Sequence, residues 1–279
     1  MNPVSKKVLF GTAGIPQSTP ETSSLSGIHQ IKNLGLECME IEFVKGAHMK
    51  TDLAEKIKDK ADSHSVSLSI HAPYYINLNS PEEGKRLASQ ERIIGTARIA
   101  AVCGAKSLIF HPGYYGKKTP EQTYSTIKQG LINIITILRA ENNSVILRPE
   151  TMGKKSQFGS LEEILFLCRE LEEIQPCIDF SHLHTRTGKI NSYDEFIKIL
   201  KKIEKKLGKK TMNNMHIHVS GAEYNRYGEI KHLNLQDSDF KYDEWISALR
   251  DFGIEGRIIS ESPIQEKDAI MLKKLYYDS

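Results

Sequence analysis

The sequence predicts an α/β protein that folds as a single (β/α)8 TIM barrel domain spanning residues 1–279. Three observations favour this fold. Short apolar runs alternate with longer segments of helical periodicity, and the alternation repeats eight times. The length of 279 residues suits one barrel, since such domains run to about 250 residues. The first expected strand is followed by Gly11-Thr12-Ala13-Gly14, which lacks the GxGxxG spacing of a dinucleotide-binding sheet.

The expected elements follow one another without interruption. The expected strands are residues 8–10, 38–43, 67–71, 107–111, 145–148, 177–179, 215–219 and 257–260. The expected helices are residues 25–34, 52–64, 82–102, 121–140, 161–171, 193–207, 242–252 and 267–276. Start signals precede four of these helices, at Thr51, Ser80-Pro81, Thr119-Pro120 and Ser160, and glycine stop signals follow four, at Gly35, Gly104, Gly208 and Gly253. No low-complexity linker or shift in composition marks a domain boundary.

Composition and charge restrict the classes of protein. The chain has 38 Lys+Arg against 35 Asp+Glu, a net charge of +3, which by itself does not indicate a nucleic-acid partner. No segment approaches the roughly 20 apolar residues of a membrane span, and the first residues are too polar for a secretory signal. We therefore expect a cytoplasmic protein without a membrane partner. The four cysteines form no CxxC pair, which excludes a zinc ribbon and a disulfide scaffold.

Metal-ligand side chains stand at the ends of six consecutive expected strands. They are His71, His111, Glu150, Asp179, His218 and Glu261. A histidine at one strand end is more often a hydrogen-bonded structural residue. However, the strand ends of a barrel meet at one rim, where so many titratable groups would repel or stay unpaired without bound cations. The mixture of imidazole and carboxylate favours Zn²⁺, with Mn²⁺ or iron as alternatives.

The number of ligands exceeds what one ion needs, so we expect two or three ions. A carboxylate such as Glu150 can bridge two cations about 3.5–4 Å apart. His182 and the loop residue His232 could together reach a further, peripheral ion. His216 and His218 lie two apart and could both point into the barrel, but His218 is nearer the rim and is the expected ligand.

The loops that follow the strands carry positive charge. Candidate DNA-binding cations are Lys45, Lys154, Lys155, Arg186 and Arg226. Cations around a metal site would favour a polyanion, because each phosphate contact displaces counterions. Lysines on loops are also a common feature of soluble surfaces. Tyrosines in the same loops could stack on bases or could cap the barrel by packing.

Six short motifs resemble the endonuclease IV family of abasic-site endonucleases, within the wider xylose-isomerase-like group. They are His71-Ala-Pro-Tyr74, His111-Pro-Gly113, Pro149-Glu150-Thr151, Asp179-x-x-His182, the strand residue His218 and Glu261-x-Pro263. Each motif alone is weak, but their order along these strands is specific. The resemblance spans almost the whole chain.

The resemblance implies a trinuclear zinc cluster and the ligands of each ion. The implied sets are His71, His111 and bridging Glu150 for the first ion, Glu150, Asp179, His218 and Glu261 for the second, and His182 with His232 for the third. Tyr74 matches a DNA-contacting tyrosine of the family. The family pattern has an aspartate two residues before the loop histidine, where this chain has Ile230. Glu229, His184 or water could replace it, or the third site could be weak or empty.

The sequence therefore predicts a zinc-dependent endonuclease that hydrolyses the phosphodiester 5′ to an abasic site in duplex DNA, as in base excision repair. Glu150 would be the bridging ligand, and Glu261 would position or deprotonate the attacking water. One alternative is a metal-dependent sugar isomerase or epimerase on the same barrel. Another is a catalytically impaired DNA-binding relative. We expect a monomer, and no protein partner is indicated.

Overall fold

The structure is a computed structural model that describes residues 8–44, 46 and 48–278. Its central feature is a sheet of parallel strands in the order β6-β4-β3-β2-β1-β12-β9-β8. These strands are β1 (Val8–Ala13), β2 (Cys38–Glu42), β3 (Ser67–His71), β4 (Ser107–Phe110), β6 (Ile146–Pro149), β8 (Ile178–Asp179), β9 (Met215–Val219) and β12 (Gly256–Ser260). Parallel bridges from Leu147 to Ile174 and from Glu150 to Cys177 join β6 to the chain around β8. The sheet thereby closes into a barrel, as predicted.

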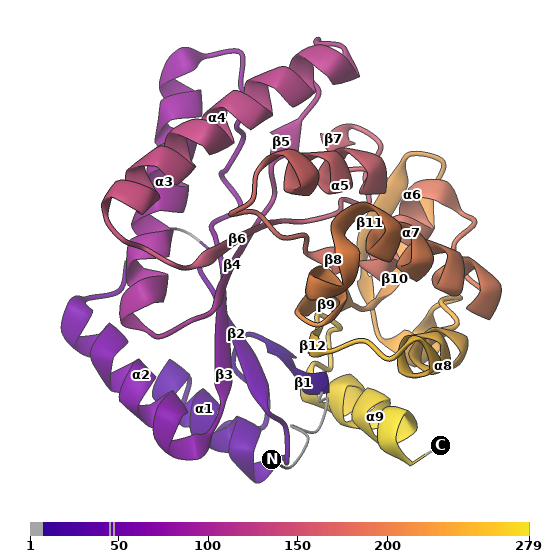
Figure 1. The fold of residues 1–279 in the computed structure, drawn as a ribbon. Helices are drawn as coiled ribbons and strands as arrows, with labels where there is room; N and C mark the ends of the chain where they lie inside the picture. Colours follow the sequence, from indigo (N-terminus) through magenta and orange to yellow (C-terminus); the bar gives the residue numbers. More distant parts are fainter. Residues whose placement is uncertain (1–7, 45, 47, 279) are drawn as a thin grey trace.

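The long helices form a ring outside the barrel (Figure 1). They are α1 (Ser24–Asn33), α2 (Thr51–His64), α3 (Glu83–Val102), α4 (Pro120–Ala140), α5 (Leu161–Glu170), α7 (Tyr193–Met212), α8 (Tyr242–Phe252) and α9 (Glu266–Tyr277). Each expected strand and helix is found within a few residues of its expected bounds. Among the described residues, no helix combines the length and apolar character needed to cross a bilayer.

Local sequence signals explain where several helices begin and end. Thr119 and Gln122 form a reciprocal capping box at the start of α4, with proline as the first helical residue. Ser160 and Glu163 form the same box at the start of α5. Gly253 ends α8 in the left-handed conformation, with φ of 72°, which costs glycine little because it lacks Cβ.

Short additional elements follow the C-terminal ends of the barrel strands and were not predicted. They are β5 (Gly113–Tyr114), β7 (Gln157–Phe158), the short helix α6 (Phe180–Thr187), β10 (Gly221–Asn225), β11 (Gly228–Leu233) and the 3₁₀ helix η1 (Leu235–Asp237). β5 pairs with β7, and β10 pairs with β11, both antiparallel. These elements build the rim of the barrel at the end where the expected ligands collect.

The apolar core lies mainly between the sheet and the ring of helices. The inside of the barrel is more polar. Arg148 is fully buried there and donates to Ser107 Oγ and to the carbonyl oxygens of Pro176 and Asn214, at 2.8–2.9 Å. These bonds satisfy the guanidinium below the mouth, so the lower barrel is filled by a fixed side chain.

Trp245 of α8 packs against the short helix α6, and its substitution tests this packing. Its ring is fully buried, 5.7 Å from the ring of Phe180 and 6.0 Å from that of Phe240. We expect Trp245→Ala to lower the free energy of unfolding in urea by about 3–5 kcal/mol, because it leaves a cavity. The exposed-site control Leu87→Ala should change it by less than about 0.5 kcal/mol. Equal losses in the two variants would contradict this packing.

Candidate metal centre

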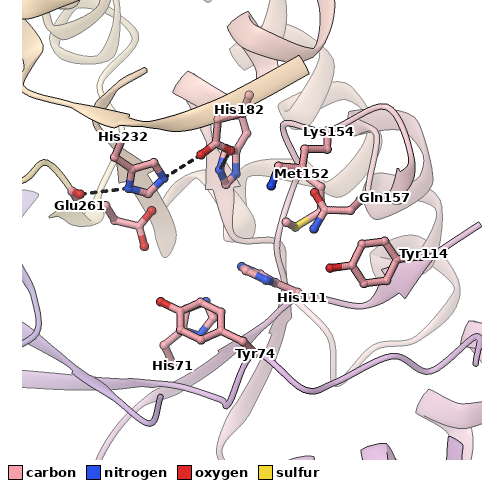
Figure 2. Close-up of a pocket in the computed structure, with 11 residues that line it drawn as sticks. His71, Tyr74, His111, Tyr114, Met152, Lys154, Gln157, His182, His232 and Glu261 are labelled. Atoms are coloured by element: carbon pink, nitrogen blue, oxygen red, sulfur yellow. Dashed lines mark hydrogen bonds and ion pairs between the residues drawn. The ribbon is translucent and has the colours of Figure 1, made fainter. Parts of the chain in front are cut away.

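The expected ligands surround a cavity of about 260 Å³ at the C-terminal ends of the strands. Its lining comprises His71, Tyr74, His111, Tyr114, Met152, Lys154, Gln157, His182, Glu229, His232 and Glu261. Figure 2 shows the imidazoles approaching this space from different sides, with Tyr74 and Tyr114 at its edge. The residues come from β3 and the loop after it, the loops after β4, β6 and β12, the short strands β5 and β7, the helix α6 and the hairpin strand β11.

Glu150 lies at the centre of this arrangement, where β6 ends. Its Oε2 atom is 3.4 Å from Nε2 of His71 and 3.2 Å from Nε2 of His111. Its Oε1 atom is 3.1 Å from Nδ1 of His182 and 3.6 Å from Nδ1 of His218. The two oxygens of one buried carboxylate therefore face two different sets of imidazoles. This is the placement that a carboxylate bridging two ions requires.

The ligand atoms gather into three groups around the cavity, and within each group all of them lie within 4.8 Å of one another. The groups are His71, His111 and Glu150 (first group), Glu150, Asp179, His218 and Glu261 (second group), and His182, Glu229 and His232 (third group). They coincide with the sets that the resemblance implies, with Glu229 added to the third. The sequence order of the motifs thus translates into three neighbouring sites, and Glu150 belongs to two of them.

Unpaired polar atoms test whether these residues fit metal ions. Glu150 Oε1, Asp179 Oδ2 and His218 Nδ1 are buried and have no hydrogen-bond partner. All three belong to the second group. Buried polar atoms without a partner are costly, and a shared cation would satisfy them together. The donor set of nitrogen and oxygen atoms also suits Zn²⁺ or Mn²⁺.

Burial and neighbouring charges act in opposite directions on the pKa values of the candidate ligands. Burial alone would raise the pKa of Glu150, but the close imidazoles of His111, His182, His218 and His71 hold this pKa well below its usual value. Burial alone would lower the pKa of His71, but nearby Glu42 and Glu150 raise it to about 10. A proton on His71 offsets the neighbouring carboxylates, which is the role that cations would take.

A β-bulge explains how the third group gains a carboxylate although Ile230 replaces the family's aspartate. In the β10–β11 hairpin, Glu223 pairs with Lys231 and the next residue Tyr224 pairs with Glu229, so Ile230 has no opposite residue. The extra residue reverses the alternation of side chains along β11. Glu229 and His232, three apart, therefore turn to the same side, while Ile230 is 47% exposed.

The contacts of Glu229 place its carboxylate between two imidazoles. Oε2 lies 2.8 Å from Nε2 of His182, and Oε1 lies 3.2 Å from Nε2 of His232. Nδ1 of His182 is 2.8 Å from the carbonyl oxygen of Thr151, which fixes that ring with Nε2 toward the site. His184, the other candidate substitute, points elsewhere, with Nε2 3.1 Å from Oδ1 of Asp239. Glu229 is thus the substitute that the geometry supports.

The residues expected to contact DNA have different surroundings. Tyr74 is 55% exposed beside the cavity. Lys154 also lines the cavity. The guanidinium of Arg186 donates to the carbonyl oxygens of Met152 and Lys154, so it braces this loop.

Two further residues expected to contact DNA, Lys155 and Arg226, lie near Tyr227 of the hairpin. The backbone N–H of Lys155 donates to the Tyr227 carbonyl oxygen at 3.0 Å, which ties its loop to the hairpin. Arg226 lies over the ring of Tyr227, 4.8 Å from its centre. Lys45 lies outside the described residues.

A layer of buried polar groups beneath the cavity was not anticipated. Glu40 is fully buried, with its carboxylate against His216 and His218. Cys177 places its sulfur within 4.8 Å of ligand atoms of the same two histidines. The available signal was the alternation of acidic and apolar residues in 38–42, which places Glu40 and Glu42 on one face of the strand.

The fold and site define a member of a known family. The chain belongs to the xylose isomerase-like TIM barrel family, whose profile matches residues 28–275. It is 48% identical over 270 residues to an uncharacterized protein of Methanocaldococcus jannaschii, covering 96% of this chain and 97% of that protein. It is 26% identical over 231 residues to a probable endonuclease 4 of Aster yellows witches'-broom phytoplasma, covering 80% of this chain and 77% of the relative. The resemblance to endonuclease IV proteins is therefore confirmed.

Solved structures share the fold across nearly the whole chain. Endonuclease IV from Thermus thermophilus superimposes with a TM-score of 0.72 at 19% identity, covering 96% of this chain and 100% of that one. A D-tagatose 3-epimerase-like protein superimposes with a TM-score of 0.71 at 20% identity, covering 96% of each chain. At these identities the likeness shows the barrel fold and does not separate endonucleases from epimerases.

The third group yields a test of the bulge. Glu229→Ala removes the carboxylate between His182 and His232, so we expect the zinc content of dialysed, metal-replete protein to fall by about one ion per chain. The control Glu223→Ala, whose side chain is 50% exposed on the same hairpin and pairs with Lys231, should keep the wild-type content. Elemental analysis measures both. Unchanged zinc in Glu229→Ala would exclude this residue as a ligand.

Proposed function

We propose that this protein is a zinc-dependent endonuclease that hydrolyses the phosphodiester 5′ to abasic sites in duplex DNA. The observation that carries the proposal is the position of Glu150 between imidazoles of all three ligand groups. A site that shares one carboxylate in this way suits closely spaced ions, which two-metal phosphodiester hydrolysis uses. The similarity to proteins named probable endonuclease 4 supports the same chemistry.

The three groups would hold the ions, with Glu150 bridging the first and second groups. When bound, the ions would supply Lewis-acid polarisation of the phosphodiester and would neutralise the charge that develops on its oxygens. Glu261 borders the cavity and its Oε1 is 3.2 Å from Nδ1 of His218. Its carboxylate would position the attacking water and accept a proton from it. No side-chain nucleophile is required.

The cavity would select a nucleotide that lacks its base. Extruding an abasic nucleotide from a duplex costs less free energy than extruding an intact one, because there is no base to unstack. Lys154 would attract the phosphates, and the exposed ring of Tyr74 would contact the DNA beside the extruded sugar. The protein would act on DNA as a monomer in the cytoplasm.

A metal-dependent sugar epimerase is the second candidate. The second group supports it, because Glu150, Asp179, His218 and Glu261 form a four-ligand site that is complete without the other groups. An epimerase needs one ion to polarise a small sugar. The first and third groups have no role in that reaction, so their presence favours the endonuclease.

The direct test uses a duplex that carries one tetrahydrofuran abasic analogue, which resists elimination. Metal-replete protein should cut immediately 5′ to the analogue and leave a 3′-hydroxyl, and a chelator should abolish the cut. Glu150→Ala should lose both incision and bound metal, whereas the surface control Glu91→Ala on α3 should keep both. Protein shown to hold metal but unable to cut would contradict the proposal. It should then be assayed with ketohexoses as an epimerase.

Lys154 tests the DNA-binding face. We expect Lys154→Ala to weaken binding to abasic duplex and to reduce the slope of log affinity against log salt by about one, because one phosphate contact is lost. Lys201→Ala, an exposed change on the outer helix α7, should leave the slope unchanged. Fluorescence anisotropy at several salt concentrations measures both. Equal slopes for all three proteins would place the phosphate contacts elsewhere.

A further inference from the structure

Glu40 is a fully buried carboxylate one layer below the ligands. It lies on β2, directly opposite Ser69 of β3. Its Oε1 atom is 2.9 Å from Nε2 of His218, and its Oε2 atom is 2.9 Å from Nε2 of His216. Ser69 Oγ donates to Oε2 at 2.7 Å. Oε2 thus has donors from two other strands, whereas Oε1 faces Nε2 of His218 in a close ion-pair contact without the alignment of a hydrogen bond.

The two nitrogens of His218 face in different directions. Nε2 faces Glu40, while Nδ1 lies 3.2 Å from Oε1 of Glu261 and 3.6 Å from Oε1 of Glu150. A neutral imidazole carries one proton, and a carboxylate beside Nε2 keeps that proton on Nε2. The lone pair of Nδ1 then points toward the second group, which is the state that a metal ligand needs.

We propose that Glu40 is a positioning residue of the metal centre, which fixes the tautomer and orientation of His218 so that its Nδ1 binds the ion of the second group. This inference rests on the proposed metal centre. None of the three ligand groups around the cavity includes Glu40, so it acts through His218 and not as a ligand. Its negative charge also makes the imidazole a stronger donor.

The chemistry of the barrel interior supports a functional role for this carboxylate. In the described part of the chain, the ion-pair contacts of Glu40 are with the two imidazoles, and none is with a lysine or arginine. Apolar side chains would fill a barrel layer at lower cost than a carboxylate that must be taken out of water. Metal-binding histidines commonly have a carboxylate partner that orients the ring. In that arrangement the free-energy cost of burying the carboxylate is offset by its support of metal binding.

The test measures metal affinity, so it does not depend on catalytic activity. Glu40→Gln keeps the shape of the side chain but replaces one acceptor oxygen with an NH₂ donor, which cannot accept from an imidazole N–H. In titrations with Co²⁺ against a competing chelator, we expect one ion to bind about 10–100-fold more weakly. The visible spectrum of the bound Co²⁺ should change as well, because the ligand field at His218 changes.

The matched control is Glu37→Gln. Glu37 directly precedes the same strand at the opposite end of the barrel, where its carboxylate pairs with Lys273, and it belongs to none of the three ligand groups. Its substitution should leave the Co²⁺ affinities within about twofold of the wild type. Circular dichroism establishes that each variant folds. If Glu40→Gln does not fold, Glu40→Asp takes its place, because the shorter carboxylate keeps its charge but does not reach both imidazoles.

A double-mutant cycle separates positioning from general support of the fold. In a His218→Ala background, Glu40→Gln should change metal affinity by less than about twofold, because the residue it acts through is gone. An equal loss of affinity in both backgrounds, or no loss in either, would overturn the proposal. If wild-type protein binds no Co²⁺ or Zn²⁺, both the metal centre and this inference fail. If it binds normally and Glu40→Gln matches it, only the inference fails.

Discussion

The carboxylate of Glu150 organises the mouth of this barrel. Its two oxygens face imidazoles from β3, from the loop after β4, from α6 and from β9. A carboxylate this deeply buried is costly unless positive charge surrounds it. The surrounding carboxylates raise the pKa values of His71 and His182, so these imidazoles contribute such charge. The proposed ions would supply it instead, so one group links the fold, the electrostatics and the proposed chemistry.

The closed sheet brings these side chains together. Parallel strands end at one rim, so residues far apart in the sequence become neighbours there. The short elements that follow the strands then complete the site. Asp179 ends β8 and accepts the backbone N–H of His182 at 2.7 Å, which caps α6 and orients that histidine. The β10–β11 hairpin brings in Glu229 and His232 from the opposite side.

Much of this arrangement could be predicted from the sequence, and the exceptions have physical reasons. The eight barrel units are marked by apolar runs and helix caps, which are local signals. The two-residue strands β5 and β7 are too short to carry a pattern. The role of Glu229 depends on the bulge at Ile230, and a bulge reverses the alternation on which strand interpretation depends. Glu40 acquires its partners His216 and His218 only when the barrel closes.

The central claim is that metal binds beside Glu150, and its most direct test is to locate the bound metal. Crystals of metal-replete protein, measured with X-rays at the zinc absorption edge, would locate bound zinc by anomalous scattering. We expect peaks within bonding distance of Glu150, with one ion on the side of His71 and His111 and another on the side of His218. A well-ordered Glu150 that contacts protonated histidines, with no anomalous peak beside it, would contradict the account.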